Sequence, residues 1–297
     1  MCGVVSIVYG DSHEGLGREA GALLKKLEYR GYDSTGAAVL DAEGRITLRK
    51  KVGAPSRVIQ ELDIERLAGQ RFVGQVRWAT YGSVTDVNAQ PHEVDCRVHL
   101  VGAHNGNISN TDSLKEFLAD NSHRVLSDND GEMLVHVVEH FYSEENATPA
   151  ASMAQSIDRV VMAIRRANHK VIGSYAACFA IPDVPGVFAV KAGSSLYAGK
   201  GHDEAGDFIV VSSDLTSVLS KTRFLIPLAE GDGIYFTHDS YFVFSLEEGT
   251  RSVPKLRRSK LNVAEISLQQ KYHFFMEQEI FSTSAGLDQI LPYYFMK

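Results

Sequence analysis

A cysteine stands at the second position of the chain, which opens Met-Cys-Gly-Val-Val. If Met1 is removed, Cys2 carries a thiol and a free α-amine on the same residue. The amine has a pKa of about 7.7 to 8.0, against about 8.5 for a free thiol, so it can act as the base that activates its own side chain. Cys2 is therefore the candidate nucleophile. Because a cysteine also occurs at this position by chance, other residues must support the assignment.

Three further short patterns could bind a ligand. Residues 77–80 (Arg-Trp-Ala-Thr) end a predicted strand, where the arginine can hold a carboxylate through two hydrogen bonds and the aromatic ring can exclude water. In residues 104–106 (His-Asn-Gly), where a strand is expected to give way to a loop, the Asn side chain and the next backbone N–H can converge on a developing oxyanion. Residues 127–132 contain Asp130, whose carboxylate can pair with an ammonium group. Taken alone, each pattern more often marks an ordinary structural feature, which would be a strand end, a turn and a helix cap respectively.

Two other patterns point to different chemistry. Residues 136–140 match the H-x-x-E-H pattern of one class of zinc peptidase, and residues 15–20 match G-x-G-x-x-A of a dinucleotide site. Apolar neighbours of the first pattern indicate the edge of a buried helical stripe, and a predicted hairpin follows the second where a βαβ unit would be needed. We therefore expect neither a metal site nor a cofactor.

The spacing of apolar residues predicts the elements that must position these groups. An apolar, β-branched run predicts a buried strand over residues 4–9, which would anchor the first residues of the chain. The predicted strands are residues 4–9, 35–40, 45–50, 71–76, 97–103, 174–181, 186–191, 208–213, 233–237 and 241–246, and the predicted helices are residues 16–27, 112–119, 130–142 and 151–166. Two of these helices begin at Asp, which is a good N-cap. Many strands with helices in two groups favour an α+β fold of packed sheets covered by helices.

Composition excludes several classes of protein. With 297 residues, 44% of them hydrophobic, the chain can bury a core without disulfides or metals. Its net charge of -7 and its lone basic cluster at residues 255–260 argue against a nucleic-acid groove. Three widely spaced cysteines indicate a reducing compartment. Without a signal-peptide pattern or a run of about 20 apolar residues, we expect a soluble, cytoplasmic protein that does not enter a membrane.

Six motifs then occur in one specific order. They are Cys2-Gly-Val-Val, Leu-Glu-Tyr-Arg-Gly-Tyr-Asp-Ser at residues 27–34, Arg-Trp-Ala-Thr at 77–80, Val-Asn-Ala-Gln-Pro-His at 87–92, His-Asn-Gly at 104–106 and Ser-Asp-Asn-Asp at 127–130. Together they resemble the glutaminase (class II glutamine amidotransferase) domain of the glucosamine-6-phosphate synthases, over about residues 2–245 and more weakly near residues 272–281. The second and third motifs favour this family over the related phosphoribosylpyrophosphate amidotransferases.

The resemblance implies an N-terminal-nucleophile hydrolase fold, with four layers in the order αββα and two stacked, mainly antiparallel sheets. It implies thiolate attack on the side-chain amide of L-glutamine, loss of ammonia past Trp78, and hydrolysis of a glutamyl thioester. The implied roles are Cys2 as nucleophile, Asn105 and Gly106 as oxyanion hole, Arg77 as carboxylate clamp, Asp130 as partner of the ammonium, Trp78 and Thr80 in the loop that closes over glutamine, and Arg30 in positioning Cys2.

The chain departs from the family pattern at two positions and in length. Tyr81 and Gln90 stand where the family usually has histidines, near the glutamine loop. We expect a glutaminase domain over residues 2–249 and, over residues 250–297, a linker and the start of a synthase/isomerase region that is missing or is a separate partner. The resemblance also admits a homodimer. The alternative function is a non-catalytic, glutamine-binding regulatory module.

Overall fold

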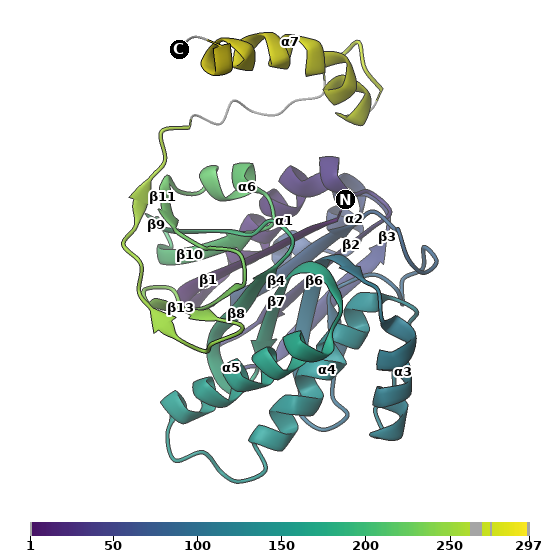
Figure 1. Cartoon of the computed structure of the whole chain (residues 1–297), viewed down its shortest axis with the longest axis vertical. Helices are drawn as coiled ribbons and strands as arrows, with labels where there is room; N and C mark the ends of the chain where they lie inside the picture. The colour runs from purple at the N-terminus through teal and green to yellow at the C-terminus, as the bar shows by residue number, and fades with distance from the viewer. Residues whose placement is uncertain (1, 262–268, 274, 296–297) are drawn as a thin grey trace. The chain divides into compact units, whose positions relative to one another are not determined.

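A computed structural model describes residues 2–261, 269–273 and 275–295. They divide into two compact units, the first ending at Lys260 and the second beginning at Leu261. The first unit holds two β-sheets stacked between two groups of helices (Figure 1). The four-layer αββα fold implied by the resemblance is thereby confirmed.

The first sheet contains eight strands and the second seven, and the strand pairings described in both are antiparallel. In spatial order the first sheet is β15 (Arg257–Arg258), β11 (Phe224–Ile226), β9 (Tyr197–Asp203), β10 (Gly206–Ser212), β1 (Gly3–His13), β4 (Gly69–Arg77), β2 (Ser34–Leu40) and β3 (Ile46–Val52). The second is β14 (Arg251–Ser252), β13 (Tyr241–Ser245), β12 (Asp232–Phe236), β8 (Val184–Ala192), β7 (Gly173–Ile181), β6 (Leu100–Ile108) and β5 (His92–Val94). Strand β1 therefore lies inside its sheet, with a partner on each side.

Helices cover the outer face of each sheet. The helices of the first unit are α1 (Leu16–Leu27), α2 (Pro55–Glu61), α3 (Thr111–Asp120), α4 (Asp130–Glu145), α5 (Met153–Lys170) and α6 (Leu215–Leu219), with short 3-10 turns at η1 (Glu28–Arg30) and η2 (Ile64–Arg66). Helix α1 packs its leucine stripe on the outside of the first sheet, while α3, α4 and α5 pack on the outside of the second (Figure 1). Alternating residues of the strands thus face a helix layer or the opposite sheet.

The inner faces of the two sheets meet in one apolar layer. Val4 and Val8 of β1 and Val73 of β4 pack there against Val101 and Ala103 of β6. In a strand every second residue shares a face. The same alternation places Cys2 on the face of Val4, Arg77 on the face of Val73, and Asn105 on the face of Ala103. All three therefore belong to the two inner faces, which is why the fold can bring them together.

Some boundaries differ from those predicted. Strand β6 begins at Leu100 and runs to Ile108, so residues 104–106 lie within a strand and the expected loop there is wrong. The N-caps are also not aspartates: Asn129 caps α4 by accepting the N–H of Gly131, and Asn110 precedes α3. Strands β5, β9 and β11 and helices α2 and α6 were not predicted, because short elements carry too few residues to show a period.

Residues 251–252 and 257–258 belong to the sheets. Strand β14 pairs with β13 and β15 with β11, and the first compact unit ends at Lys260. In the second unit, helix α7 (Phe275–Phe295) exposes apolar side chains, among them Ile280, Phe281 and Phe295. None of the helices in the described residues has both the length and the apolar content needed to cross a bilayer.

Candidate active site

Cys2 lies at the start of β1, beside the end of β4. The register pairs Gly3 with Val76, so the chain's first residues run against the Arg77–Trp78 peptide. The Cys2 thiol donates to the Trp78 carbonyl at 3.3 Å, and the Trp78 N–H lies 3.4 Å from Sγ. Burial raises the pKa of this thiol, and the Trp78 contact and the charge of Arg77 only partly oppose that rise. In this environment the thiol needs a base to become a nucleophile.

Arg30 fixes the backbone of Cys2. Its Nε donates to the Cys2 carbonyl at 3.1 Å, and its Nη1 lies 4.0 Å from Oδ1 of Asp214. The Tyr29 hydroxyl donates to the same Oδ1 at 2.6 Å, while Oδ2 of Asp214 caps helix α6 by accepting the N–H of Ser217 at 2.7 Å. Arg30 and Asp214 are thus far apart in sequence but in contact in the fold. Asp214 was not among the predicted residues.

Arg77 is fully buried at the end of β4 and holds the loop that follows it. Its guanidinium donates to the Ser83 carbonyl at 2.9 Å, to the Gly82 carbonyl at 3.2 Å and to the Tyr81 carbonyl. Burial lowers the pKa of Arg77, although nearby acidic groups and the Cys2 thiol oppose that change. The donors that could bind a carboxylate are thus engaged with loop carbonyls.

The loop after Arg77 has three further attachments. The N–H of Ala79 donates to Asp33 at 2.8 Å, and the Tyr81 hydroxyl accepts a hydrogen bond from Thr111 at 3.3 Å. The Trp78 ring lies 5.3 Å from the ring of Tyr32, measured between centroids, while Thr80 is exposed. Trp78 and Thr80 therefore lie in the segment directly after β4.

Gly31 explains part of the 27–34 motif. A Cβ at this position would lie 2.5 Å from the carbonyl carbon and 2.7 Å from the nitrogen of the Arg77–Trp78 peptide. Backbone cannot give way at such distances, so only glycine lets the turn after Arg30 pack against the end of β4.

On the second sheet, Asn105 and Gly106 lie in β6 and pair with Ala176 and Tyr175 of β7. Asn105 is buried. Gly106 has φ of +156°, and a Cβ there would lie 2.2 Å from the Ser174 carbonyl oxygen. The positive φ and the close Ser174 carbonyl therefore both require glycine at this position inside β6.

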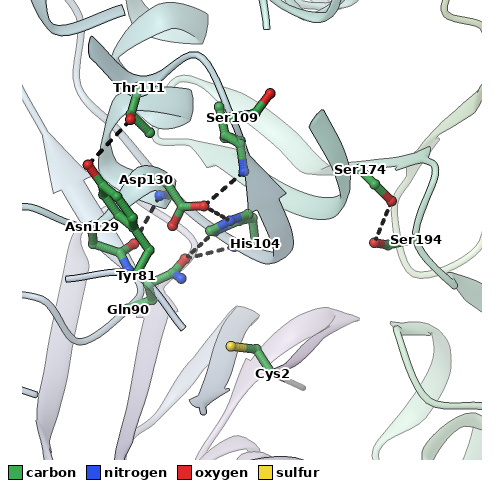
Figure 2. A network of polar contacts seen from close by, with 12 residues as sticks. Cys2, Tyr81, Gln90, His104, Ser109, Thr111, Asn129, Asp130, Ser174 and Ser194 are labelled. Carbon is green, nitrogen blue, oxygen red and sulfur yellow. Dashed lines mark hydrogen bonds and ion pairs between the residues drawn. The ribbon is translucent and has the colours of Figure 1, made fainter. Parts of the chain in front are cut away.

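Asp130, at the first turn of α4, belongs to a buried polar network with His104 and Gln90 (Figure 2). Its Oδ2 accepts the N–H of Ile108 at 3.0 Å and lies 3.3 Å from His104 Nε2. Burial acts to raise the pKa of Asp130, but His104 and the Ile108 N–H outweigh it, so the pKa lies below its usual value. Gln90 Oε1 accepts the N–H of His104 at 2.8 Å and lies 3.2 Å from its Nδ1.

The two sheets are also linked directly at this point. Gln75 of β4 donates to the carbonyl of His104 at 3.5 Å, next to Asn105. Arg77 and Asp130 both act electrostatically on the thiol of Cys2, and Figure 2 shows Cys2 facing the network of Asp130, His104 and Gln90. The fold thus gathers a thiol, a buried cation and a buried carboxylate, from elements far apart in sequence.

Several residues of this site were not predicted. Asp33, Asp214, His104 and Gln90 support the predicted residues but were given no role. Asp33, His104 and Gln90 lie within quoted motifs, so their positions carried a signal. Nothing near Asp214 in sequence distinguishes it from an ordinary helix cap.

Comparison with known proteins identifies relatives of this chain by sequence similarity. No family model matches the chain. It is 33% identical over 243 residues to a glutamine–fructose-6-phosphate aminotransferase (isomerizing) of Sulfolobus acidocaldarius, which covers 82% of the chain and 38% of the relative. The protein of the same name from Sulfurisphaera tokodaii is 30% identical over 291 residues, covering 98% of the chain and 46% of the relative. The chain is homologous to the glutamine–fructose-6-phosphate aminotransferases.

The fold agrees with this homology. A glutamine phosphoribosylpyrophosphate amidotransferase from B. subtilis superposes with a TM-score of 0.65 at 22% identity, over 83% of the chain and 50% of that protein. The regulatory enzyme of purine biosynthesis gives a TM-score of 0.66 with similar coverage. The N-terminal-nucleophile amidotransferase fold is thus shared. The chain spans less than half the length of the aminotransferases it matches, for example 35% of the Aeropyrum pernix protein.

Proposed function

We propose that the chain hydrolyses L-glutamine to glutamate and ammonia, with Cys2 as the N-terminal nucleophile once Met1 is removed. The observation that carries the proposal is the position of the Cys2 sulfur, against the Trp78 peptide and within the electrostatic reach of Arg77 and Asp130. An amino acid carries a carboxylate and an ammonium group. This site holds the buried cation Arg77, which can pair with the carboxylate, and the buried carboxylate Asp130, which can pair with the ammonium. The homology to glutamine-named aminotransferases selects glutamine among amino acids.

The reaction would proceed in two stages. The α-amine of Cys2 takes the thiol proton, and the thiolate adds to the δ-carbon of glutamine. The amide oxygen gains the negative charge, which Asn105 and the N–H of Gly106 stabilise. The carbon–nitrogen bond then breaks with return of the proton to the leaving amine, and ammonia leaves. Water hydrolyses the remaining thioester, releasing glutamate and restoring the thiol.

Binding would exchange protein contacts for ligand contacts. The guanidinium of Arg77 now donates to carbonyls of residues 81–83, and a bound α-carboxylate would take over part of these donors. Asp130 would receive the ammonium group. Trp78 and Thr80, on the attached loop, would cover the ligand, and Arg30 would keep the backbone of Cys2 in place through its carbonyl.

The test is turnover combined with mapping of the nucleophile. The purified chain is expected to release glutamate and ammonia from glutamine, to lack Met1 by intact mass, and to be alkylated once by a glutamine-like electrophile at Cys2. Cys2→Ala is expected to lower turnover at least about 1,000-fold, because it removes the reacting atom. Labelling at Cys178 or Cys96, or full activity with Met1 retained, would reject the assignment.

The names of the relatives support a proposal for the final acceptor of ammonia. We propose that a region outside the given sequence, or a separate partner, aminates fructose 6-phosphate with the ammonia. Adding in trans the region of a full-length relative that this chain does not match should then couple glutamine hydrolysis to amino-sugar formation. Ammonia that is always released free would contradict this acceptor without touching the glutaminase proposal.

A non-catalytic glutamine-binding module is the second candidate. It is favoured by the engagement of Arg77 with its own loop and by the Tyr81 and Gln90 substitutions. Calorimetry would then detect glutamine binding while ammonia release stayed at background.

A further inference from the structure

A second buried group of reactive residue types lies further along helix α4. One ligand atom each from Cys96, His123, His136 and Glu139 lies within 4.8 Å of the other three. The two histidines and the glutamate are buried, and Cys96 is exposed. We call these four residues the α4 cluster. They come from three places in sequence, so only the fold brings them together.

Glu139 is the centre of the α4 cluster. Its Oε1 accepts three backbone N–H groups, those of Cys96, Arg97 and Val98, at 2.5, 2.7 and 3.4 Å. Its Oε2 faces Nδ1 of His136 at 2.8 Å and Nδ1 of His123 at 3.0 Å. The backbone therefore holds the carboxylate with one oxygen directed at two imidazole nitrogens.

The far nitrogens of these imidazoles also have partners. His136 Nε2 lies 3.7 Å from Glu132 Oε1. His123 Nε2 lies 3.1 Å from His140 Nδ1, and His140 Nε2 lies 3.3 Å from Glu144 Oε1. All six nitrogens of the three rings thus face a neighbour.

Three of these contacts are hydrogen bonds: His136 to Glu139, His123 to Glu139, and the bond between His123 and His140. The contacts of His136 with Glu132 and of His140 with Glu144 are ion-pair contacts. A neutral imidazole carries one proton. One proton on each of the three rings therefore satisfies the three hydrogen bonds and leaves the contacts with Glu132 and Glu144 without a proton.

A dication would satisfy all five contacts at once. Bound to the two Nδ1 atoms and to Glu139, it would replace two protons and leave the proton of each ring for one of the three remaining contacts. His136 would then donate to Glu132, His123 to His140, and His140 to Glu144. Metal-bound imidazoles commonly donate their other N–H to a carboxylate or similar acceptor, so these neighbours form the expected outer layer of a metal site.

We propose that the α4 cluster binds a zinc-type divalent ion through Cys96 Sγ, His123 Nδ1, His136 Nδ1 and Glu139 Oε2. Thiolate, imidazole and carboxylate are the ligands of protein zinc, and bonds of about 2.0 to 2.3 Å in a tetrahedron place ligand atoms about 3.3 to 3.8 Å apart. The Sγ of Cys96 also lies 3.3 Å from the N–H of Arg124, which would stabilise a thiolate.

Such a site would be structural. Four protein ligands leave no open position for a substrate, so the peptidase interpretation of residues 136–140 does not apply. The peptidase interpretation also needs His136 and His140 to bind the same metal ion, whereas the ring nitrogens of His140 contact His123 and Glu144. The ion would join α4 to the segments around Cys96 and His123, and α4 carries Asp130 at its first turn.

The test is metal content of the untagged full chain. After incubation with zinc and desalting, we expect about one zinc per chain, and cobalt in its place should give a thiolate-to-cobalt charge-transfer band. Cys96→Ser should lower zinc retention at least about tenfold and remove that band. Cys2→Ser is the matched control, because it changes a thiol outside the α4 cluster and should retain the zinc.

Two results would overturn the proposal. One is a wild-type chain that binds no zinc under these conditions yet shows its normal circular dichroism. The other is equal zinc retention by wild type and Cys96→Ser with no cobalt–thiolate band in either. Thermal unfolding of the zinc-loaded and chelator-treated chain gives an independent measure, since bound metal must raise the midpoint.

Discussion

The candidate active site and the α4 cluster both contain buried polar side chains, but these side chains find their hydrogen-bond partners in different ways. Arg77 donates to carbonyls of its own following loop, which are contacts that a ligand can replace. Glu139 accepts three backbone N–H groups and faces two imidazoles, contacts that lie within packed elements. A site that binds and releases a substrate needs hydrogen-bond partners that a ligand can replace. A site that only stabilises the fold does not need them.

Helix α4 contributes to both regions. Its first residue, Asp130, belongs to the network next to Cys2, while His136 and Glu139 belong to the α4 cluster. Changes in the first region should therefore alter the reaction, and changes in the second should alter stability or metal content. Asp130 should affect stability as well, because it accepts the N–H of Ile108.

Asn105→Ala should have the largest effect in this set. Loss of one oxyanion donor is expected to lower kcat about 100- to 1,000-fold, measured as glutamate formed at saturating glutamine. The midpoint of thermal unfolding should change by no more than about 3 °C, since the strand pairing of β6 is kept. A large loss of stability with unchanged kcat would reverse the distinction drawn between the two regions.

Asp130→Asn should show an intermediate, pH-dependent effect on stability. The folded-state pKa of Asp130 is depressed, so its ionisation stabilises the fold above the usual aspartate pKa, and this contribution is lost as pH falls through the depressed value. We expect wild type to exceed the variant by about 1 to 2 kcal/mol at pH 7. Urea unfolding at a series of pH values should show the difference shrinking below about pH 4. A difference independent of pH would mean that His104 and Ile108 do not favour the charged form.

Tyr81→Phe should have the smallest effect. It removes the oxygen that accepts from Thr111 and leaves the ring, at an exposed position. The KM for glutamine should change by about fivefold or less while kcat stays within about twofold, because a single weak hydrogen bond is worth about 1 kcal/mol. Thr111→Val is the matched variant, since it removes the other half of the same bond. A large fall in kcat would place Tyr81 among the reacting groups.

Much of the framework could be predicted from local patterns. The apolar run at residues 4–9 and the leucine spacing of residues 16–27 each report a buried face directly, and both elements form as expected. The grouping of helices against many strands predicted packed sheets covered by helices, and the resemblance implied the αββα order of the layers. Short strands such as β5 and β11 escaped prediction because their residues are fixed by pairing with distant partners, which leaves no period in the sequence.

The site was predictable only where its chemistry is concentrated in motifs. Cys2 and Arg77 are conspicuous in sequence, and alternation along β1 and β4 explains why both reach the inner sheet faces. Asp214 is an example of a site residue that could not be predicted. Its contact with Arg30 depends on the pairing of β1 with β10, which no local pattern reveals. The assembly of Cys96 with His123 and Glu139 is likewise a property of the fold alone.

The interior position of β1 also bears on synthesis in the cell. One neighbour of β1 is β10, with Val5 opposite Ser212, so the strand that follows Cys2 cannot complete its pairing until that distant segment has been translated. At about 5 to 20 residues per second, roughly 10 to 40 s separate the two events. The proposed function requires removal of Met1, and during this interval an aminopeptidase could act on an N-terminal strand whose pairing is still incomplete. Strand topology would then place this removal before the sheet is finished.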